Sequence, residues 1–549
     1  MSLTRNQQLT LELYNNLNNI STVEDFVLAK KKIFGQDKID PPSNSDTLKI
    51  YNELLDLKII SSNDKFEKFC KKHKVRTLSG VSVIAILTEE RPCPGNCAFC
   101  PTEPDMPKSY LSNEPAVMRA IKCNFDAYAQ IRARLHALKI NGHDTSKNEI
   151  IIMGGTWSYL EHEYQERFIL GMFQGLNEGI RMDDNNLLPI RMDEKLIKKI
   201  KLEQQKNEIS DNRCVGLTLE TRPDYIDERE LIRMREFGCT RIEIGVQTIF
   251  DDIAILNKRG HLVDKTIKAT KLMKDAGFKI CYHMMPNLPG STIEKDIKMF
   301  DELYNNSDFK PDMVKIYPCV VVKNAEIYKW MLDGTYTPYT DQELSDLLIE
   351  VKKITPYWVR INRLIRDIPS TSIEGGNKIP NLREVVLRKM QKSGLKCNCI
   401  RCREIRDKDF DIDDVDLFIE EYKASDGIEY FLSFEDKSRN NIFSFLRLRI
   451  PSQYFSHEKH FIKELENAAI IREIHTYGEV VSINDKNKKE DTQHIGFGRK
   501  LISAAFEIIK EKYPSIKNIA VISGVGVRSY YKKNGFELVG TYMIKKIEN

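Results

Sequence analysis

Cys93-Pro94-Gly95-Asn96-Cys97-Ala98-Phe99-Cys100 is the stretch around which the rest of the chain is organised. Its three cysteines are spaced C-x3-C-x2-C, and the loop follows an apolar run, residues 81–87, that predicts a buried strand. Thiolates at these spacings can converge on one soft metal centre. We therefore expect Cys93, Cys97 and Cys100 to hold a 4Fe-4S cluster with one iron left open. The alternatives are a zinc knuckle or three unrelated buried cysteines.

The length and composition indicate a globular protein of more than one domain. A chain of 549 residues is too long for one hydrophobic core, and 41% hydrophobic with 30% charged residues is typical of soluble proteins. The N-terminus is polar, and no run approaches the roughly 18 apolar residues of a membrane span, so we expect neither a signal peptide nor a transmembrane helix. The 12 cysteines show no disulfide framework, which favours a reducing, cytoplasmic compartment.

Apolar runs alternate with amphipathic helical stretches between about residues 75 and 340. This alternation predicts an α/β fold of right-handed βαβ units with a parallel sheet, a partial (β/α)6-type barrel. In such barrels the chemistry lies at the C-terminal ends of the strands, where the cysteine loop stands. The expected strands are residues 81–87, 149–154, 214–219, 240–247, 278–285 and 313–322, and the expected helices are residues 116–138, 230–237, 263–276 and 294–304.

Polar and glycine motifs follow the other expected strands. The second strand ends in Met153-Gly154-Gly155-Thr156, where the glycines allow a ligand to approach the backbone. Ordinary turn chemistry would explain any one of these motifs, but their position at successive strand ends indicates one site. The remaining motifs are Glu220-Thr221-Arg222-Pro223-Asp224, Gly245-Val246-Gln247-Thr248, residues 284–290 and Lys315-Ile316-Tyr317-Pro318.

The cysteine loop resembles the signature of the radical S-adenosylmethionine (SAM) enzymes. In that family the open iron of the cluster chelates SAM, and the reduced cluster cleaves it to a 5′-deoxyadenosyl radical. The resemblance implies that Gly154, Gly155 and Thr156 bind SAM.

Four further segments narrow the resemblance. Residues 114–121, 152–156, 219–224 and 283–286 are similar to the catalytic subunit family of Elongator, which synthesises carboxymethyluridine in tRNA. The likeness runs from about residue 75 to the C-terminus. The chain departs from many relatives in the shorter gap between its first two cluster cysteines. It also departs at residues 374–384, where relatives have a compact Glu-His-Gly-Asn-Leu-Arg-Glu, and this puts the role of that histidine in question.

A second cysteine cluster lies in a basic context. Cys397, Cys399 and Cys402 form a C-x-C-x2-C pattern that suits a structural zinc site, which needs a fourth protein ligand. His283, Cys281 and Cys319 are the candidates for that ligand, and a cysteine-rich turn without metal is the alternative.

Residues 352–406 hold 14 Lys and Arg against 4 Asp and Glu, with Tyr357 and Trp358 among them, and residues 71–76 form a second basic run. Basic residues interleaved with aromatics suit nucleic acid, and a solvated surface is the alternative.

The pattern changes to that of a mixed sheet from about residue 411. Gln493-His494-Ile495-Gly496-Phe497-Gly498 opens a predicted helix over residues 500–512, and glycines at a helix start suit a diphosphate. This is the pattern of the GNAT acetyltransferases at their coenzyme A site. The expected strands are residues 430–432, 442–448, 468–475, 480–483 and 519–523.

The Elongator resemblance implies residues of an acetyl-CoA site. Lys147 corresponds to a family lysine that contacts acetyl-CoA from the radical domain, and Lys315 and Tyr317 stand at the sixth strand. We expect one ring of Tyr530-Tyr531 to pack and one hydroxyl to face the thioester. The candidate catalytic residues are Lys147, Lys315, Tyr317 and Tyr531, and the candidate acetyl-CoA residues are Lys147, Glu473, Ile474, His475, Thr476, Gln493, Gly496, Phe497, Gly498 and Tyr531.

The resemblance implies an enzyme that uses acetyl-CoA and a SAM-derived radical to add a carboxymethyl group at C5 of the wobble uridine. It implies tRNA, through the anticodon stem-loop, as partner, with Elongator-type subunits or self-association in addition, and structural zinc as a further cofactor. A protein lysine N-acetyltransferase with a structural cluster, and a nucleic-acid-binding scaffold without catalysis, are the alternatives. The expected regions are a helical N-terminal extension with a possible tRNA contact (1–75), a radical SAM domain (76–390), a zinc-binding basic linker (391–410) and a GNAT domain (411–549).

Overall fold

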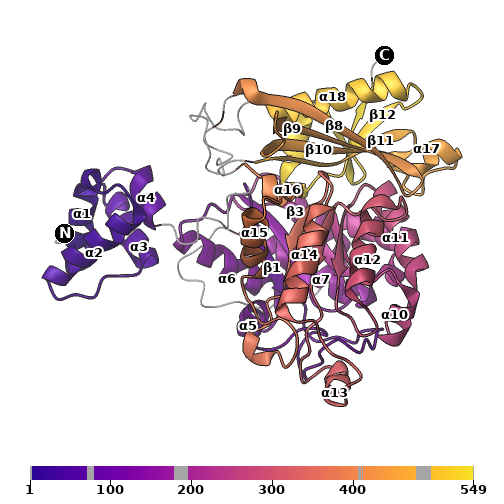
Figure 1. The fold of residues 1–549 in the computed structure, drawn as a ribbon. Helices are drawn as coiled ribbons and strands as arrows, with labels where there is room; N and C mark the ends of the chain where they lie inside the picture. Colours follow the sequence, from indigo (N-terminus) through magenta and orange to yellow (C-terminus); the bar gives the residue numbers. More distant parts are fainter. Residues whose placement is uncertain are drawn as a thin grey trace.

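The structure, a computed structural model, describes residues 3–70, 80–178, 196–405, 410, 412–477 and 496–547. Figure 1 shows a small helical bundle, a large α/β unit and a second α/β unit packed on it. The two α/β units each contain one seven-stranded sheet. Within the described ranges, no helix combines the length and the apolar character needed to cross a bilayer.

The first sheet is parallel throughout and has the order β1-β2-β3-β4-β5-β6-β7. Its order places β1 and β7 at opposite edges, so the sheet curls as an open half-barrel. The six predicted strands are confirmed, but β7 was missed because only Ile361 of its four residues is fully buried. The strands are Ser82–Leu87, Lys147–Met153, Arg213–Thr221, Arg241–Gln247, Lys279–Met284, Met313–Ile316 and Arg360–Arg363.

Helices cover the outer face of this half-barrel. The prediction of one helix over residues 116–138 was wrong, because the chain turns at Asn124 and Phe125, which both have positive φ. Asp126 then caps a new helix by accepting a hydrogen bond from the Ala129 backbone N–H. The helices are α5 (Pro115–Lys122), α6 (Ala127–Ile140), α7 (His162–Asn177), α8 (Leu196–Asn207), α9 (Glu228–Glu236), α10 (Asp251–Leu256), α11 (Val263–Asp275), α12 (Ile293–Asn305), α13 (Ile327–Leu332), α14 (Asp341–Lys353), α15 (Leu382–Lys392) and α16 (Ile400–Arg403).

The second sheet is mixed, as predicted, and has the order β13-β14-β12-β11-β10-β9-β8. Only β11 and β12 pair in parallel, and α18 (Phe497–Lys512) connects them along the chain. The predicted strand over residues 480–483 lies outside the described residues. The strands are Val415–Ala424, Gly427–Asp436, Ile442–Ile450, Ala468–Thr476, Asn518–Val521, Glu537–Val539 and Tyr542–Lys546, and the other helices are α17 (Ser452–Ser456) and α19 (Arg528–Lys533).

The N-terminal residues form a helical bundle with its own core, which agrees with the predicted helical extension. The helices α1 and α2 each begin with a capping box, and Phe26, Tyr51 and Phe66 are fully buried between them and their neighbours. The four helices are Arg5–Asn15, Val23–Gln36, Asn44–Asp56 and Asp64–Cys70.

Buried ion pairs join the two α/β units. Arg472 of β11 donates to the Asp312 carboxylate at 2.9 Å and to the Glu429 carboxylate at 2.8 Å. Arg449 of β10 donates to Asp275 at the end of α11 at 2.7 Å. None of these side chains is more than 1% exposed. Glu429 belongs to the second unit, whereas Asp312 and Asp275 belong to the first, so Arg472 and Arg449 each form a buried ion pair across the interface that helps to fix the two units against one another.

Candidate functional site

One cavity of about 1530 Å³ connects the two α/β units. It begins at the cysteine loop after β1, passes along the inner face of the first sheet and reaches the start of α18 in the second unit. Its walls hold predicted residues from both units. These include Cys93, Cys97, Cys100, Lys147, Gly155, Thr156, Lys315, Tyr317, Glu473, Ile474, His475, Thr476, Gly496, Gly498 and Tyr531.

The cysteine loop is anchored by backbone hydrogen bonds to distant parts of the first unit. Ala98 donates its N–H to the Asn257 carbonyl at 3.0 Å and accepts from the Ile327 N–H at 3.1 Å. The sulfurs of Cys93, Cys97 and Cys100 do not all lie within 4.8 Å of one another. Three thiolates on one zinc ion would be only about 3.8 Å apart, from a Zn–S distance of about 2.3 Å. The wider arrangement fits a cluster of several irons better than one ion.

The glycine segment after β2 lies beside this loop. Gly154 has φ +122° and Gly155 has φ +69°, a backbone region that favours glycine. A Cβ on Gly154 would lie 2.2 Å from the Thr88 hydroxyl oxygen. The Thr156 hydroxyl is 3.6 Å from the Cys93 sulfur, so this segment lies at the cysteine-loop end of the cavity.

Arg222 closes the other side of the cysteine loop. Its guanidinium donates to both Asp224 carboxylate oxygens, at 2.9 and 2.8 Å, while Nη1 is buried without a hydrogen-bond partner among the described residues. A Cβ on Gly95 would lie 2.0 Å from this Nη1 and 3.6 Å from the Cys97 sulfur. The orphaned N–H group therefore faces the space beside the cysteines, and a sulfur-rich anionic cluster would satisfy it.

Gly95→Ala is expected to reduce iron incorporation strongly, because Arg222 is held by Asp224 and cannot move away from the new methyl group. Iron and sulfide per chain after anaerobic reconstitution measure this effect. Gly35→Ala in α2, where a Cβ meets nothing within 4 Å, is the control and should leave iron content unchanged. Full incorporation by the Gly95 variant would contradict this arrangement of the loop.

Charged side chains from four strands meet in the middle of the cavity. Lys315 forms ion pairs with Glu243 and, at 3.3 Å, with Glu220, and His283 lies 2.7 Å from Glu243 through Nε2. Burial opposes the charge of Lys315, but Glu243, Tyr317 and Glu220 together outweigh it and raise the pKa of the lysine. These ion pairs favour the protonated form of Lys315. Tyr317 packs edge-on against His283, with ring centres 5.4 Å apart.

The start of α18 forms the opposite end of the cavity. Gly496 has φ +80° and precedes the first helical residue, Phe497, which is buried against Phe434. A Cβ on Gly498 would lie 3.0 Å from the Tyr530 hydroxyl oxygen. The N–H groups at the start of this 16-residue helix would suit a diphosphate. Gln493 lies outside the described residues.

The two adjacent tyrosines have different environments. The Tyr531 side chain is 7% exposed and packs against Phe536, whereas Tyr530 is 38% exposed. Burial raises the pKa of Tyr531. Both residues line the cavity. The ring of Tyr531 thus packs and its hydroxyl hydrogen-bonds no described residue, so this one tyrosine can combine the packed ring and the thioester contact that were expected of two different tyrosines.

Residues 473–476 at the end of β11 line the same end of the cavity. Glu473 accepts from Arg447 at 2.9 Å and pairs with Lys279 at 3.9 Å, and these cations lower its pKa although burial opposes them. His475 stacks on Phe445 and lies tilted against Tyr477, and burial lowers its pKa. Lys147 lines the cavity from the first residue of β2.

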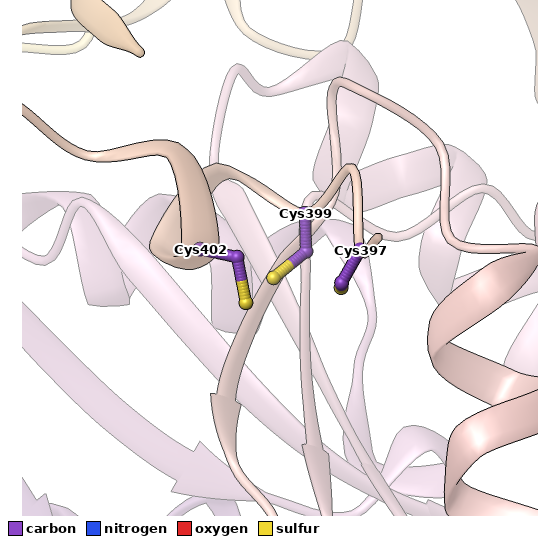
Figure 2. Close-up of side chains that lie close together, drawn as sticks. All are labelled: Cys397, Cys399 and Cys402. Carbon is purple, nitrogen blue, oxygen red and sulfur yellow. The ribbon is translucent and has the colours of Figure 1, made fainter. Parts of the chain in front are cut away.

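The second cysteine cluster is compact. Figure 2 shows the side chains of Cys397, Cys399 and Cys402 converging, and their sulfurs all lie within 4.8 Å of one another. Within the described ranges, no fourth Cys, His, Asp or Glu joins this group. The structure groups Cys281 and His283 with Glu243 instead, and packs Cys319 in a separate apolar cluster. The buried Lys352 lies 3.4 Å from Cys402, a cation that suits a thiolate-rich site.

Several residues of the site were missed from the sequence. Arg241 and Glu243 face the cavity, as does Gly245 of the predicted motif at the end of the fourth strand, while Ile242 and Ile244 between them enter the core. This alternation with a period of two was visible in the sequence and could have revealed the two charged residues. Arg259 and Lys279 had no such signal, because the one follows a short helix and the other begins a strand.

Two family descriptions and several relatives match this chain. The Radical SAM superfamily matches residues 91–303, and the Radical_SAM C-terminal domain matches residues 311–392. A tRNA uridine(34) acetyltransferase of Methanocaldococcus jannaschii is 44% identical over 93% of this chain and 91% of its own length. Elongator complex protein 3 of Saccharomyces cerevisiae is 38% identical over 98% of this chain and 95% of its own length.

A solved structure supports the same relationship. The archaeal Methanocaldococcus infernus Elp3 with an N-terminus deletion (1–46) has a TM-score of 0.72 and 41% identity to this chain, and the match covers 85% of this chain and 99% of that one. Matches over 93% and 98% of this chain extend over both α/β units, and the Radical SAM superfamily match includes the cysteine loop. The chain therefore belongs to the family of Elongator complex protein 3 and the tRNA uridine(34) acetyltransferases, which are radical SAM proteins.

Proposed function

We propose that this protein modifies the wobble uridine of tRNA, using acetyl-CoA and SAM to add a carboxymethyl group at C5. The observation that carries the proposal is the single cavity that joins the cysteine loop to the start of α18. A radical site and an acetyl-CoA site must share one space if an acetyl group is to be activated before it reaches the uridine. Relatives named as tRNA uridine(34) acetyltransferases support this assignment.

The cluster end would be built by Cys93, Cys97 and Cys100, with Gly154 and Gly155 placing backbone close to SAM. When bound, the cluster and SAM supply one-electron chemistry that can remove a hydrogen atom from an unactivated carbon. Arg222, which lies beside the cysteine loop, would hold positive charge next to the cysteines. The residues that surround the loop would exclude water from this end of the cavity.

The acetyl-CoA end would be built by the second unit. The N–H groups after Gly496 would hold the diphosphate, and the Tyr531 hydroxyl would face the thioester. Lys315, kept protonated by Glu243, would place a positive charge between the two ends, where it can stabilise negative charge that develops on the acetyl oxygen. In this proposal Lys315 stabilises negative charge and does not transfer a proton.

Further parts of the proposal concern zinc, partners and location. The compact sulfurs of Cys397, Cys399 and Cys402 suit zinc, with Lys352 balancing their charge.

The basic residues 352–406 would contact the anticodon stem-loop, and Elongator-type subunits are further partners. Residues 1–70 hold nine Lys and Arg against ten Asp and Glu, so their net charge does not favour a tRNA contact. All 12 cysteines are unpaired, which suits the cytoplasm.

The test of the proposal is release of CoA from acetyl-CoA by the purified protein, with and without bulk tRNA. Release should depend on tRNA, and Tyr531→Phe should slow it by about tenfold, since one lost hydrogen bond of about 1–1.5 kcal/mol changes a rate by about that factor. Tyr454→Phe, a change in the same unit away from the cavity, should leave the rate unaltered. Turnover that ignores tRNA but responds to lysine peptides would instead identify a protein acetyltransferase.

A further inference from the structure

Arg259 is a buried cation that points at the cysteine loop. The residue is 5% exposed, and its Nη1 donates to the Cys97 sulfur at 3.4 Å. Its Nη2 donates to the Gly245 carbonyl. In the part of the chain that the structure describes, no carboxylate pairs with this guanidinium.

The other buried cations around this cavity do have carboxylate partners. Arg222 pairs with Asp224 at 2.8 Å, and Lys315 pairs with Glu243 and Glu220. A buried guanidinium without a counter-ion is costly, because it loses its hydration and gains no opposite charge in return. Arg259 is therefore placed for an anion that lies at Cys97.

The backbone around Arg259 holds the guanidinium in this position. Its carbonyl accepts from Arg222 Nη2 at 2.9 Å, and its N–H donates to the Ala254 carbonyl at 2.9 Å. The absence of a side chain at Gly245 is also required, since a Cβ there would lie 3.0 Å from Arg259 Nη2. The arrangement is thus fixed before any cluster is bound.

We propose that Arg259 is the counter-ion and hydrogen-bond donor of the 4Fe-4S cluster, and that it raises the reduction potential of that cluster. The proposal rests on the cluster that the proposed function assigns to Cys93, Cys97 and Cys100. Reduction adds a negative charge to a partly buried group, so a nearby cation stabilises the reduced state more than the oxidised state. Hydrogen bonds to the cluster sulfurs act in the same direction. Arg259 would thereby make the cluster reducible by a weaker donor.

The experiment is a redox titration of the reconstituted full-length protein, followed by electron paramagnetic resonance without SAM or tRNA. Arg259→Gln removes the charge and should lower the equilibrium constant for one-electron reduction about tenfold, a midpoint shift of about 59 mV to more negative potential. Lys258→Gln is the matched control. It removes the same charge one residue away, but Lys258 is 49% exposed and pairs with Glu326 at the surface, so its variant should titrate like the parent protein.

The outcomes separate this inference from the proposed function. A parent and a Lys258→Gln protein with a normal cluster, beside an Arg259→Gln protein with an unshifted potential, would overturn the inference and leave the proposed function standing. Equal shifts in both variants would also overturn it, since the effect would then be long-range charge alone. Absence of a cluster from the parent would overturn both.

A second variant covers the case in which Arg259→Gln does not retain iron. Arg259→Lys keeps the charge but lacks the fork that reaches both Gly245 and Cys97. A more negative midpoint potential in this variant supports the inference, and a potential equal to that of the parent contradicts it. Iron content and the far-ultraviolet circular dichroism spectrum, measured first, show that the potential belongs to a folded, cluster-bearing protein.

Discussion

Cys97→Ser is expected to abolish iron binding and uridine modification while the second α/β unit stays folded. Cys97 is the cysteine that Arg259 contacts, and it stands between the two other thiolates of the loop. A serine oxygen is a hard donor that replaces a soft thiolate poorly in an iron–sulfur site. Iron and sulfide content, the visible absorption band and mass analysis of tRNA nucleosides measure the three losses.

Cys123→Ser provides the control for this variant. Cys123 caps the end of α5, is half-buried and does not line the cavity, so its variant should bind iron and modify uridine normally. Binding of acetyl-CoA should persist in both variants, because the start of α18 lies at the opposite end of the cavity. Unchanged uridine modification by Cys97→Ser would refute the radical function.

Arg472→Met is expected to lower the free energy of unfolding by about 3–5 kcal/mol, the usual cost of breaking a buried ion pair from one side. Arg472 is fully buried and pairs with two carboxylates, Asp312 and Glu429, from different α/β units. A methionine side chain has a similar length, but it leaves the carboxylates of Asp312 and Glu429 without the Arg472 guanidinium. Urea unfolding followed by circular dichroism, at neutral pH, measures the loss.

Lys271→Met is the matched control across the same interface. Lys271 pairs with Asp426 at 2.7 Å, but the two side chains are 42% and 71% exposed, so solvent screens the pair. Its loss should cost no more than about 1 kcal/mol. Equal destabilisation by the two substitutions would show that burial does not set the strength of the Arg472 contacts.

Local sequence patterns were sufficient to predict those strands and loops that are marked by an apolar run or by a motif of fixed spacing. The apolar runs predicted six strands of the first sheet, and the cysteine spacing predicted the loop after β1. β7 escaped because it is four residues long and has arginine at both ends. The split between α5 and α6 was missed because Asn124 and Phe125 both adopt positive φ, which is uncommon for a residue as bulky as phenylalanine. Short or strained segments carry too little pattern to be recognised.

The roles of the predicted residues depended on their neighbours. Lys315 lines the cavity, where its ion pairs with Glu243 and Glu220 favour the protonated form. His283 was a candidate for the zinc ligand, yet it lies beside Glu243 in the cavity. Such pairings join residues from different strands, and their spacing along the chain follows no periodic rule.

The sequence by itself determined the family and the positions of the two cysteine clusters, because thiolate spacing and glycine motifs are local and are written within a few residues. Only the tertiary structure decided how the parts act together. It brought the loop at Cys97 and the guanidinium of Arg259 into contact although 162 positions separate them, and it joined both ends of the site in one cavity. Long-range contacts of this kind arise from the curl of the sheet and the packing of two units, which no single stretch of the chain encodes.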